Sequence, residues 1–108
     1  MKPILAVFAA AAAHFAHPYA AYAGDALMGR FALEQKWEDS AKGACNGVDA
    51  AMAQRLASSK FHCPTKPSSG TASGRSAVIC SGDRVEIFVF RNRADCEQER
   101  RAISANND

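Results

Sequence analysis

The chain has 108 residues, 48% of them hydrophobic, and a formal net charge of +2 at pH 7. Its 13 basic side chains nearly balance 11 acidic ones, which excludes a chain-wide attraction to nucleic acid or to anionic lipid. The length allows one small domain once the amino-terminal segment described next is set aside.

The first 23 residues have the three parts of a secretory signal peptide. Lys2 supplies a positive start, residues 4–16 form an almost unbroken apolar run, and Ala21 and Ala23 form the small-x-small pattern that signal peptidase cleaves. A membrane-spanning anchor needs about 20 apolar residues, and this run is shorter. We expect cleavage after Ala23 and export of residues 24–108 to the periplasm or the medium, with no stable membrane anchor left. The alternative is an uncleaved helix that holds the protein at the membrane.

The four cysteines all lie in the expected mature domain: Cys45, Cys63, Cys80 and Cys96. An even number of cysteines in a short exported domain is typical of disulfides. Their gaps of 18, 17 and 16 residues disfavour zinc, whose ligands usually come in closely spaced pairs. No C-x-x-C motif occurs, which argues against a thioredoxin-like redox site. The sequence predicts two disulfides, no metal and no cofactor.

A helix expected between Cys45 and Cys63 limits how the cysteines can pair. A continuous helix would hold these two residues roughly 20 Å apart, whereas bonded cysteines have Cα atoms within about 7 Å of each other. This excludes Cys45–Cys63 and therefore also Cys80–Cys96. Two pairings remain open. We favour Cys63–Cys80 with Cys45–Cys96. This pairing sets the end of the expected helix beside the end of the first predicted strand, so the long segment at residues 64–75 has to cross the sheet between them.

The first half of the mature domain has the periodicity of two helices. One would run from a cap at Asp25 to Gly43 and present an apolar stripe of Leu27, Phe31, Leu33, Trp37 and Ala41. The other would start at a cap on Asn46, supported by Asp49, and present Val48, Met52 and Leu56. We expect these helices to form an αα-hairpin around residues 43–47.

The second half has the pattern of a β-hairpin. Residues 76–80 and 84–90 are rich in Val, Ile and Phe. The Gly-Asp pair at positions 82 and 83 predicts a tight turn that sets Cys80 opposite Val85. One face of this hairpin is therefore expected to pack on the helices, because a two-stranded ribbon is not stable alone.

Phe88 and Phe90 share the other face of the hairpin, where they either wrap round the edge of the core or form a contact surface. A third helix is predicted from a cap at Asn92 through Ile103. Residues 64–75 have only small, polar and turn-forming side chains and predict a long loop that is functional or disordered. The predicted fold class is α+β: a small disulfide-stabilised domain with an αα-hairpin followed by a β-hairpin and a C-terminal helix.

No arrangement of residues in the mature domain predicts catalysis. His62 is its only histidine, and general-base catalysis needs an oriented partner. The carboxylate clusters Glu38 with Asp39 and Glu97 with Glu99 fall on expected solvated helical faces, not across a cleft. No motif for a serine nucleophile, a zinc protease or a phosphate-binding loop occurs. A small secreted hydrolase that uses His62 is one alternative interpretation, and a structural envelope factor without activity is another.

The motif CNGVDA at residues 45–50, followed by FHCP at residues 61–64, resembles the cysteine-bracketed helix of small periplasmic immunity proteins. Those proteins neutralise secreted cell-wall hydrolases. They continue into helix where this chain has a loop rich in Gly and Ser and then a β-hairpin. The resemblance therefore covers residues 45–64 alone and assigns no family.

We predict protein binding in an oxidising compartment, of the inhibitor or immunity kind. An anchored loop loses less entropy on binding, and arginines are frequent among residues that dominate binding energy. The expected contact therefore combines the loop at residues 64–75 with the strand end that follows. Its residues are Arg75, Phe88, Phe90, Arg91 and Arg93. The expected partner is an acidic protein surface and not nucleic acid. The other interpretation of these arginines is that they keep the apolar hairpin soluble.

Overall fold

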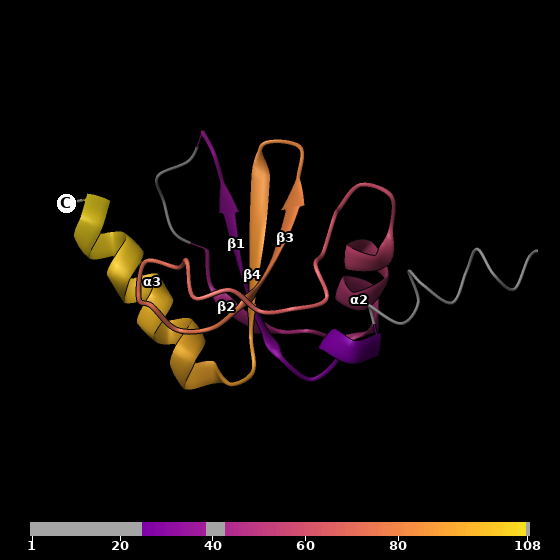
Figure 1. Ribbon diagram of the computed structural model, residues 1–108, viewed down its shortest axis with the longest axis horizontal. Helices are drawn as coiled ribbons and strands as arrows, with labels where there is room; N and C mark the ends of the chain where they lie inside the picture. Colours follow the sequence, from indigo (N-terminus) through magenta and orange to yellow (C-terminus); the bar gives the residue numbers. More distant parts are fainter. Residues whose placement is uncertain (1–24, 39–42, 108) are drawn as a thin grey trace, which may run out of the picture.

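The structure is a computed structural model that describes residues 25–38 and 43–107. The predicted signal peptide, its cleavage site, Asp39 and Ala41 lie outside these residues. The elements in chain order are the strands β1 (Phe31–Lys36) and β2 (Cys45–Gly47), the helix α2 (Ala50–Ala57), the strands β3 (Val78–Gly82) and β4 (Val85–Phe90), and the helix α3 (Arg93–Asn107). The strands form one antiparallel sheet in the order β2-β1-β4-β3 (Figure 1). The described chain is a small α+β domain.

The predicted first helix is wrong. Only residues 25–27 are helical. Residues 31–36 form β1, which lies in the middle of the sheet between β2 and β4. Phe31, Leu33 and Trp37 fit the two-residue period of a strand as well as a helical stripe. Pairing with β4 along the whole of β1 favours the strand. Glu34, which would interrupt the helical stripe, lies on the opposite face from Leu33, as alternation requires.

The predicted αα-hairpin is also wrong, because its first helix does not form and its second begins later. Asn46 lies in β2. The cap of α2 is Asp49, whose carboxylate accepts a hydrogen bond of 2.9 Å from the N–H of Met52. The acidic residue expected to support the cap is therefore the cap itself. Ala53 and Leu56 are the buried side chains of α2.

The predicted β-hairpin forms with its register shifted by two residues. Gly82, and not Cys80, pairs with Val85, so the turn consists of residues 83–84. Gly82 is needed within β3 because the ring of Phe61 lies against it. A Cβ atom at this position would stand 2.7 Å from Cε1 of Phe61. A shift of two residues keeps every side chain on its predicted face.

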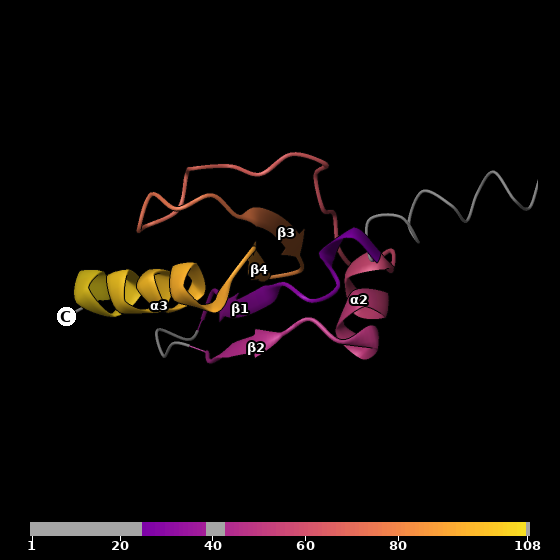
Figure 2. The ribbon, with the colours of Figure 1, turned by 90° about the horizontal axis from the view of Figure 1, so that it is seen from below.

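The two long helices cover opposite faces of the sheet (Figures 1 and 2). On one face, Leu56 of α2 belongs to a core that includes Ile87 and Val89. On the other face, α3 packs over a core that includes Leu33 and Phe90. Both faces of β4 are therefore buried, which explains why its sequence is apolar without the alternation of a half-exposed strand.

Both disulfides join an element of the sheet to a neighbouring segment. Cys45 of β2 is bonded to Cys96 of α3 with Cα atoms 6.0 Å apart, and Cys63 is bonded to Cys80 of β3 with Cα atoms 4.2 Å apart. This confirms the pairing favoured from the sequence. All four cysteines lie in the described part of the chain, and none is free. The first bond fixes α3 on the sheet, and the second fixes the segment after α2 on β3.

The C-terminal helix forms where it was predicted. The side-chain oxygen of Asn92 accepts a hydrogen bond of 2.8 Å from the N–H of Asp95, which caps the first turn. The helix continues beyond Ile103 to Asn107, and it contacts β1, β2 and β4. Only Arg91 and Asn92 separate α3 from β4, so the start of α3 lies at the end of the sheet.

Candidate functional site

His62 is exposed, and it contributes to the fold through backbone hydrogen bonds. Its N–H donates a hydrogen bond of 2.9 Å to the carbonyl of Ser81, and its carbonyl accepts one of 3.0 Å from the N–H of Ser81. Over residues 25–38 and 43–107, no carboxylate lies within 4.0 Å of the imidazole, and no three His, Cys, Asp or Glu side chains gather into a possible metal site. This geometry gives no support to the hydrolase alternative.

Residues 64–75 form a long loop, as predicted, but the loop is fastened to α3. Figure 2 shows that it leaves the α2 end of the molecule, reaches α3 and returns to β3. The carboxylate of Glu99 accepts hydrogen bonds from the backbone N–H groups of Ala72 (3.0 Å) and Ser73 (2.9 Å). The loop therefore has a fixed path between its ends and packs on α3, which its composition of small, polar and turn-forming residues did not predict.

Glu99 is only 1% exposed, whereas the sequence places it with Glu97 on a solvated face. A helical glutamate normally faces water, and nothing in the local pattern identifies the two loop N–H groups that meet this carboxylate. The available signal is spacing, because Glu99 lies three residues after the buried Cys96 and so on nearly the same side of the helix. Sequence reasoning missed it as the residue that anchors the loop.

The structure places Phe88 and Phe90 in the core beneath α3. Phe90 is fully buried and Phe88 is half-buried, and both belong to the core beneath α3 with Leu33. Phe90 is therefore wrong as a contact residue. The exposed large hydrophobic side chains among the described residues are instead Met28 (47%) and Trp37 (67%).

The three arginines predicted for the contact lie at one end of the sheet, where β4 ends and β3 begins. The side chains of Arg75 and Arg91 are 53% and 81% exposed, and each lies 4.0 Å from a carboxylate oxygen of Asp95. The guanidinium of Arg93 lies 4.8 Å from the centre of the Phe31 ring. The structure therefore brings Arg75 and Arg91 together around the carboxylate of Asp95 and sets Arg93 over Phe31 at the start of β1.

A fourth arginine, Arg30, joins them and was not singled out from the sequence. It directly precedes β1, which begins at the same end of the sheet. Its N–H donates to the carbonyl of Leu27 (3.2 Å), and its carbonyl accepts from the N–H of Val48 (2.8 Å), so its backbone is fixed. The sequence did not point to Arg30, because residues 31–36 were expected to be helical and not to form the strand β1. We call Arg30, Arg75, Arg91 and Arg93 the arginine cluster.

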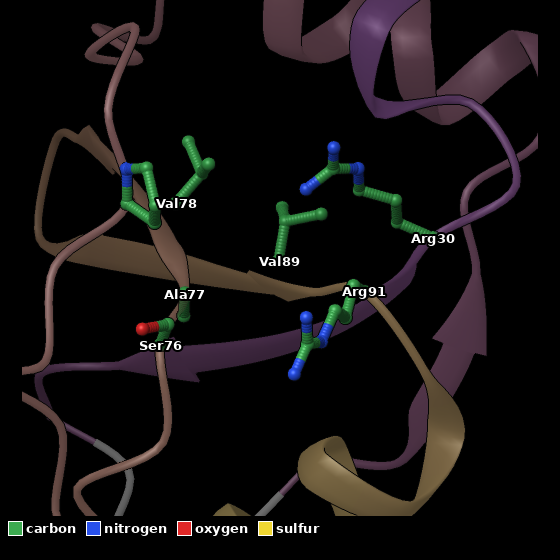
Figure 3. A pocket seen from close by; sticks show the side chains of 7 residues that line it. Arg30, Ser76, Ala77, Val78, Val89 and Arg91 are labelled. Carbon is green, nitrogen blue, oxygen red and sulfur yellow. The ribbon is translucent and has the colours of Figure 1, made fainter.

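A cavity of about 330 Å³ opens beside the arginine cluster. Its apolar lining includes Pro67, Val78 and Val89, and its polar lining consists of Arg30, Ser76 and Arg91. Figure 3 shows Arg30 and Arg91 on either side of Val89. Positive charge and apolar surface therefore meet in one hollow at the end of the sheet.

No protein family, no characterised protein and no solved structure is significantly similar to the chain. None of the helices in the described ranges has the length and apolar character that a membrane crossing requires.

Proposed function

We propose that the protein is an exported protein-binding domain of the inhibitor or immunity kind, and that the arginine cluster is the centre of its contact with an acidic partner. The observation that carries this proposal is an excess of positive charge at one end of the sheet. Four arginines lie there, and among the residues that the structure describes the carboxylate of Asp95 is the only one within 4.0 Å of any of them. A surface with charge of one sign attracts and orients a partner of the opposite sign.

The chemistry of arginine supports a protein contact. A planar guanidinium donates two parallel hydrogen bonds to a carboxylate, which gives direction as well as charge. Arginine is also enriched among the residues that dominate binding energy. Arg30 and Arg91 flank the strands β1 and β4, so their backbones are held before a partner arrives and less entropy is lost on binding.

The loop at residues 64–75 supports the proposal in a different way from that expected. Glu99 fixes the loop on α3 close to Arg75. Ser68 and Ala77 exchange two backbone hydrogen bonds of 2.8 and 3.0 Å, which hold Pro67 beside the arginine cluster. A loop of this composition without such an anchor would have to be ordered by the partner, at a cost in entropy.

The two disulfides favour an oxidising compartment as the place of action. Together with the predicted signal peptide, they support the periplasm or the medium as the location. The proposed partner is therefore another exported protein with an acidic surface.

The test is capture of a partner from an envelope extract of the producing organism. Three baits are compared: the unchanged protein, the double variant Arg91→Gln with Arg93→Gln, and Arg84→Gln. Arg84 is an exposed arginine in the β3–β4 turn at the opposite end of the sheet, so its variant has an altered charge away from the arginine cluster. We expect one partner to be retained by the unchanged protein and by Arg84→Gln, and to be lost by the double variant.

Retention of the captured protein must also decrease as the salt concentration rises, because exposed charges are screened at high ionic strength. If the partner is an enzyme, adding the unchanged protein should lower its activity and the double variant should not. A partner retained equally by all three baits, at low and at high salt, would show that the arginine cluster is not the contact.

A further inference from the structure

Arg30 and Arg91 stand opposite each other across the end of the sheet. β1 and β4 pair Phe31 with Phe90, and one more step in this antiparallel register sets Arg30 against Arg91. The register of β3 and β4, continued in the same way, sets Ser76 on the other side of Arg91. All three residues line the cavity. In Figure 3 the side chain of Arg91 extends away from that of Arg30, toward α3, where its guanidinium lies 4.0 Å from Asp95.

An anion in the cavity would be attracted by both arginines. The side chain of Arg91 is 81% exposed, so it can turn toward such an anion. Within the described residues, Arg30 has no carboxylate within 4.0 Å, and Arg91 has only Asp95, at the limit of that distance. The pair therefore retains capacity to bind an anion from outside the chain.

Apolar side chains lie directly beside these arginines. Val78 and Val89 are paired across β3 and β4, and Pro67 of the loop also lines the cavity. A volume of about 330 Å³ lies at the lower end of the range of roughly 300–1,000 Å³ for ligand pockets. Such a cavity suits a small group that carries a carboxylate next to an aliphatic part.

We infer that the cavity binds the carboxyl-terminal residue of a partner polypeptide. Its carboxylate accepts charge-assisted hydrogen bonds from Arg30 and Arg91, and the hydroxyl of Ser76 donates a further one. An aliphatic side chain lies against the exposed Pro67, beside the buried Val78 and Val89. This inference rests on the proposed protein-binding function and names the group that the partner presents.

A chain end fits the cavity better than an internal acidic residue does. Neighbouring side chains of an extended segment point to opposite sides, so an internal carboxylate and an aliphatic side chain on one face are about 7 Å apart. A terminal residue carries its carboxylate and its side chain on the same Cα atom. It also enters with one strand of chain, whereas an internal residue needs room for the chain to enter and to leave.

The experiment is a titration of the full, oxidised protein with three short peptides, followed by the NMR signals of the Val78 and Val89 backbone amides. The first peptide is acetyl-Gly-Ala-Val with a free carboxylate, and the second is its carboxamide. The third is acetyl-Gly-Asp-Val carboxamide, which has the same charge as the first but an internal carboxylate. We expect the free acid to bind about ten-fold more tightly than either amide.

Three variants locate the site. Arg30→Gln and Arg91→Gln should each weaken binding of the free acid by about ten-fold, because each removes a charged donor. Arg84→Gln should bind as the unchanged protein does. The dispersion of the amide spectrum checks that each variant is folded, and the comparison of peptides on the unchanged protein needs no variant at all.

The inference is wrong if the free acid and its amide bind equally, if no peptide shifts the Val78 and Val89 signals, or if the internal aspartate binds as tightly as the free acid. This titration uses no partner protein, and the capture experiment uses no peptide. A partner that depends on Arg91 and Arg93, together with a failed titration, would leave the proposed function standing and remove only the terminal carboxylate as its ligand.

Discussion

The guanidinium of Arg55 on α2 donates two hydrogen bonds, of 3.0 and 2.9 Å, to the two carboxylate oxygens of Glu34 on β1. This pair fastens α2 to the central part of the sheet at the rim of its core. The hydrogen bond from Arg55 is the main cause that lowers the pKa of Glu34; burial opposes it, and the charges of Arg55 and Lys36 add to it.

The Glu34–Arg55 pair should make stability depend on pH in the acid range. Because the pKa of Glu34 is lower in the folded chain than its ordinary value of 4.5, its contribution is fully present above that value and is lost as the pH falls through the folded pKa. Glu34→Gln should cost about 0.2–1 kcal/mol at neutral pH, since both side chains are partly exposed. Urea unfolding of both proteins at several pH values checks this. A difference that is as large at pH 2 as at pH 7 would contradict it.

The buried carboxylate of Glu99 should hold the loop at residues 64–75 in place. Glu99→Ala removes both acceptors of the Ala72 and Ser73 N–H groups, and we expect a loss of about 1–3 kcal/mol. Hydrogen exchange at these two amides should become faster, whereas exchange in the strands should change less. Glu97→Ala is the matched control, because among the described residues this carboxylate accepts its hydrogen bond from Arg100 of the same helix and its loss should leave the loop protected. Unchanged exchange at Ala72 and Ser73 in the Glu99 variant would disprove the anchor.

The two disulfides should contribute unequally to stability. Cys45–Cys96 closes a separation of 51 residues and Cys63–Cys80 one of 17 residues. By loop-closure entropy these separations correspond to about 4 and about 3 kcal/mol. Replacing each pair by alanine, followed by urea unfolding, should therefore show the larger loss for Cys45 with Cys96. Alkylation of the native protein without reductant should label no cysteine. A larger loss for the shorter loop would show that native packing, and not chain entropy, decides the order.

Replacing Arg84 by glycine should stabilise the protein. Arg84 has φ of 58° in the β3–β4 turn, a conformation that costs an L-residue energy and glycine little. Its ion pair with Glu38 is exposed and contributes little. We expect a gain of about 0.5–1 kcal/mol, measured by thermal unfolding. Asp83→Gly is the control, because Asp83 has no positive φ and the added chain entropy should lower stability.

His62 should be dispensable as a side chain and important as a backbone donor. His62→Ala keeps both backbone hydrogen bonds to Ser81 and should leave unfolding and partner binding nearly unchanged. His62→Pro removes the donor and should cost about 1 kcal/mol or more. Unfolding of the two variants separates these roles. A hydrolytic activity that His62→Ala abolishes would restore the enzyme interpretation.

Much of the second half of the domain could be predicted from local chemistry. The Asn92 cap and the faces of the hairpin strands follow from neighbouring residues, and the structure has both. The number of disulfides follows from the even count of cysteines over the whole domain. The hairpin register differed by two because Gly82 serves the packing of Phe61 and not the turn. A local signal cannot reveal a constraint that comes from a residue outside its own segment.

The first half could not be predicted from local chemistry, because its structure depends on distant strands. Phe31 and Leu33 become strand residues through pairing with β4, more than fifty positions later in the chain. The same error hid Arg30, which gains its place opposite Arg91 only from that pairing. The sequence left Phe90 either at the edge of the core or in a contact surface, because no helix was expected over its face; α3 covers that face.

The two disulfides are nested, since the loop closed by Cys63–Cys80 lies inside the one closed by Cys45–Cys96. A protease that cuts the backbone once between Cys45 and Cys96 therefore releases nothing, because the two fragments stay joined by at least one disulfide. A cut within the exposed stretch at residues 64–70 leaves them joined by both, with β1 still paired to β4. In a compartment that contains proteases, such a nicked, two-chain molecule would keep its arginine cluster. Its lifetime there depends on the disulfides staying oxidised more than on the loop escaping cleavage.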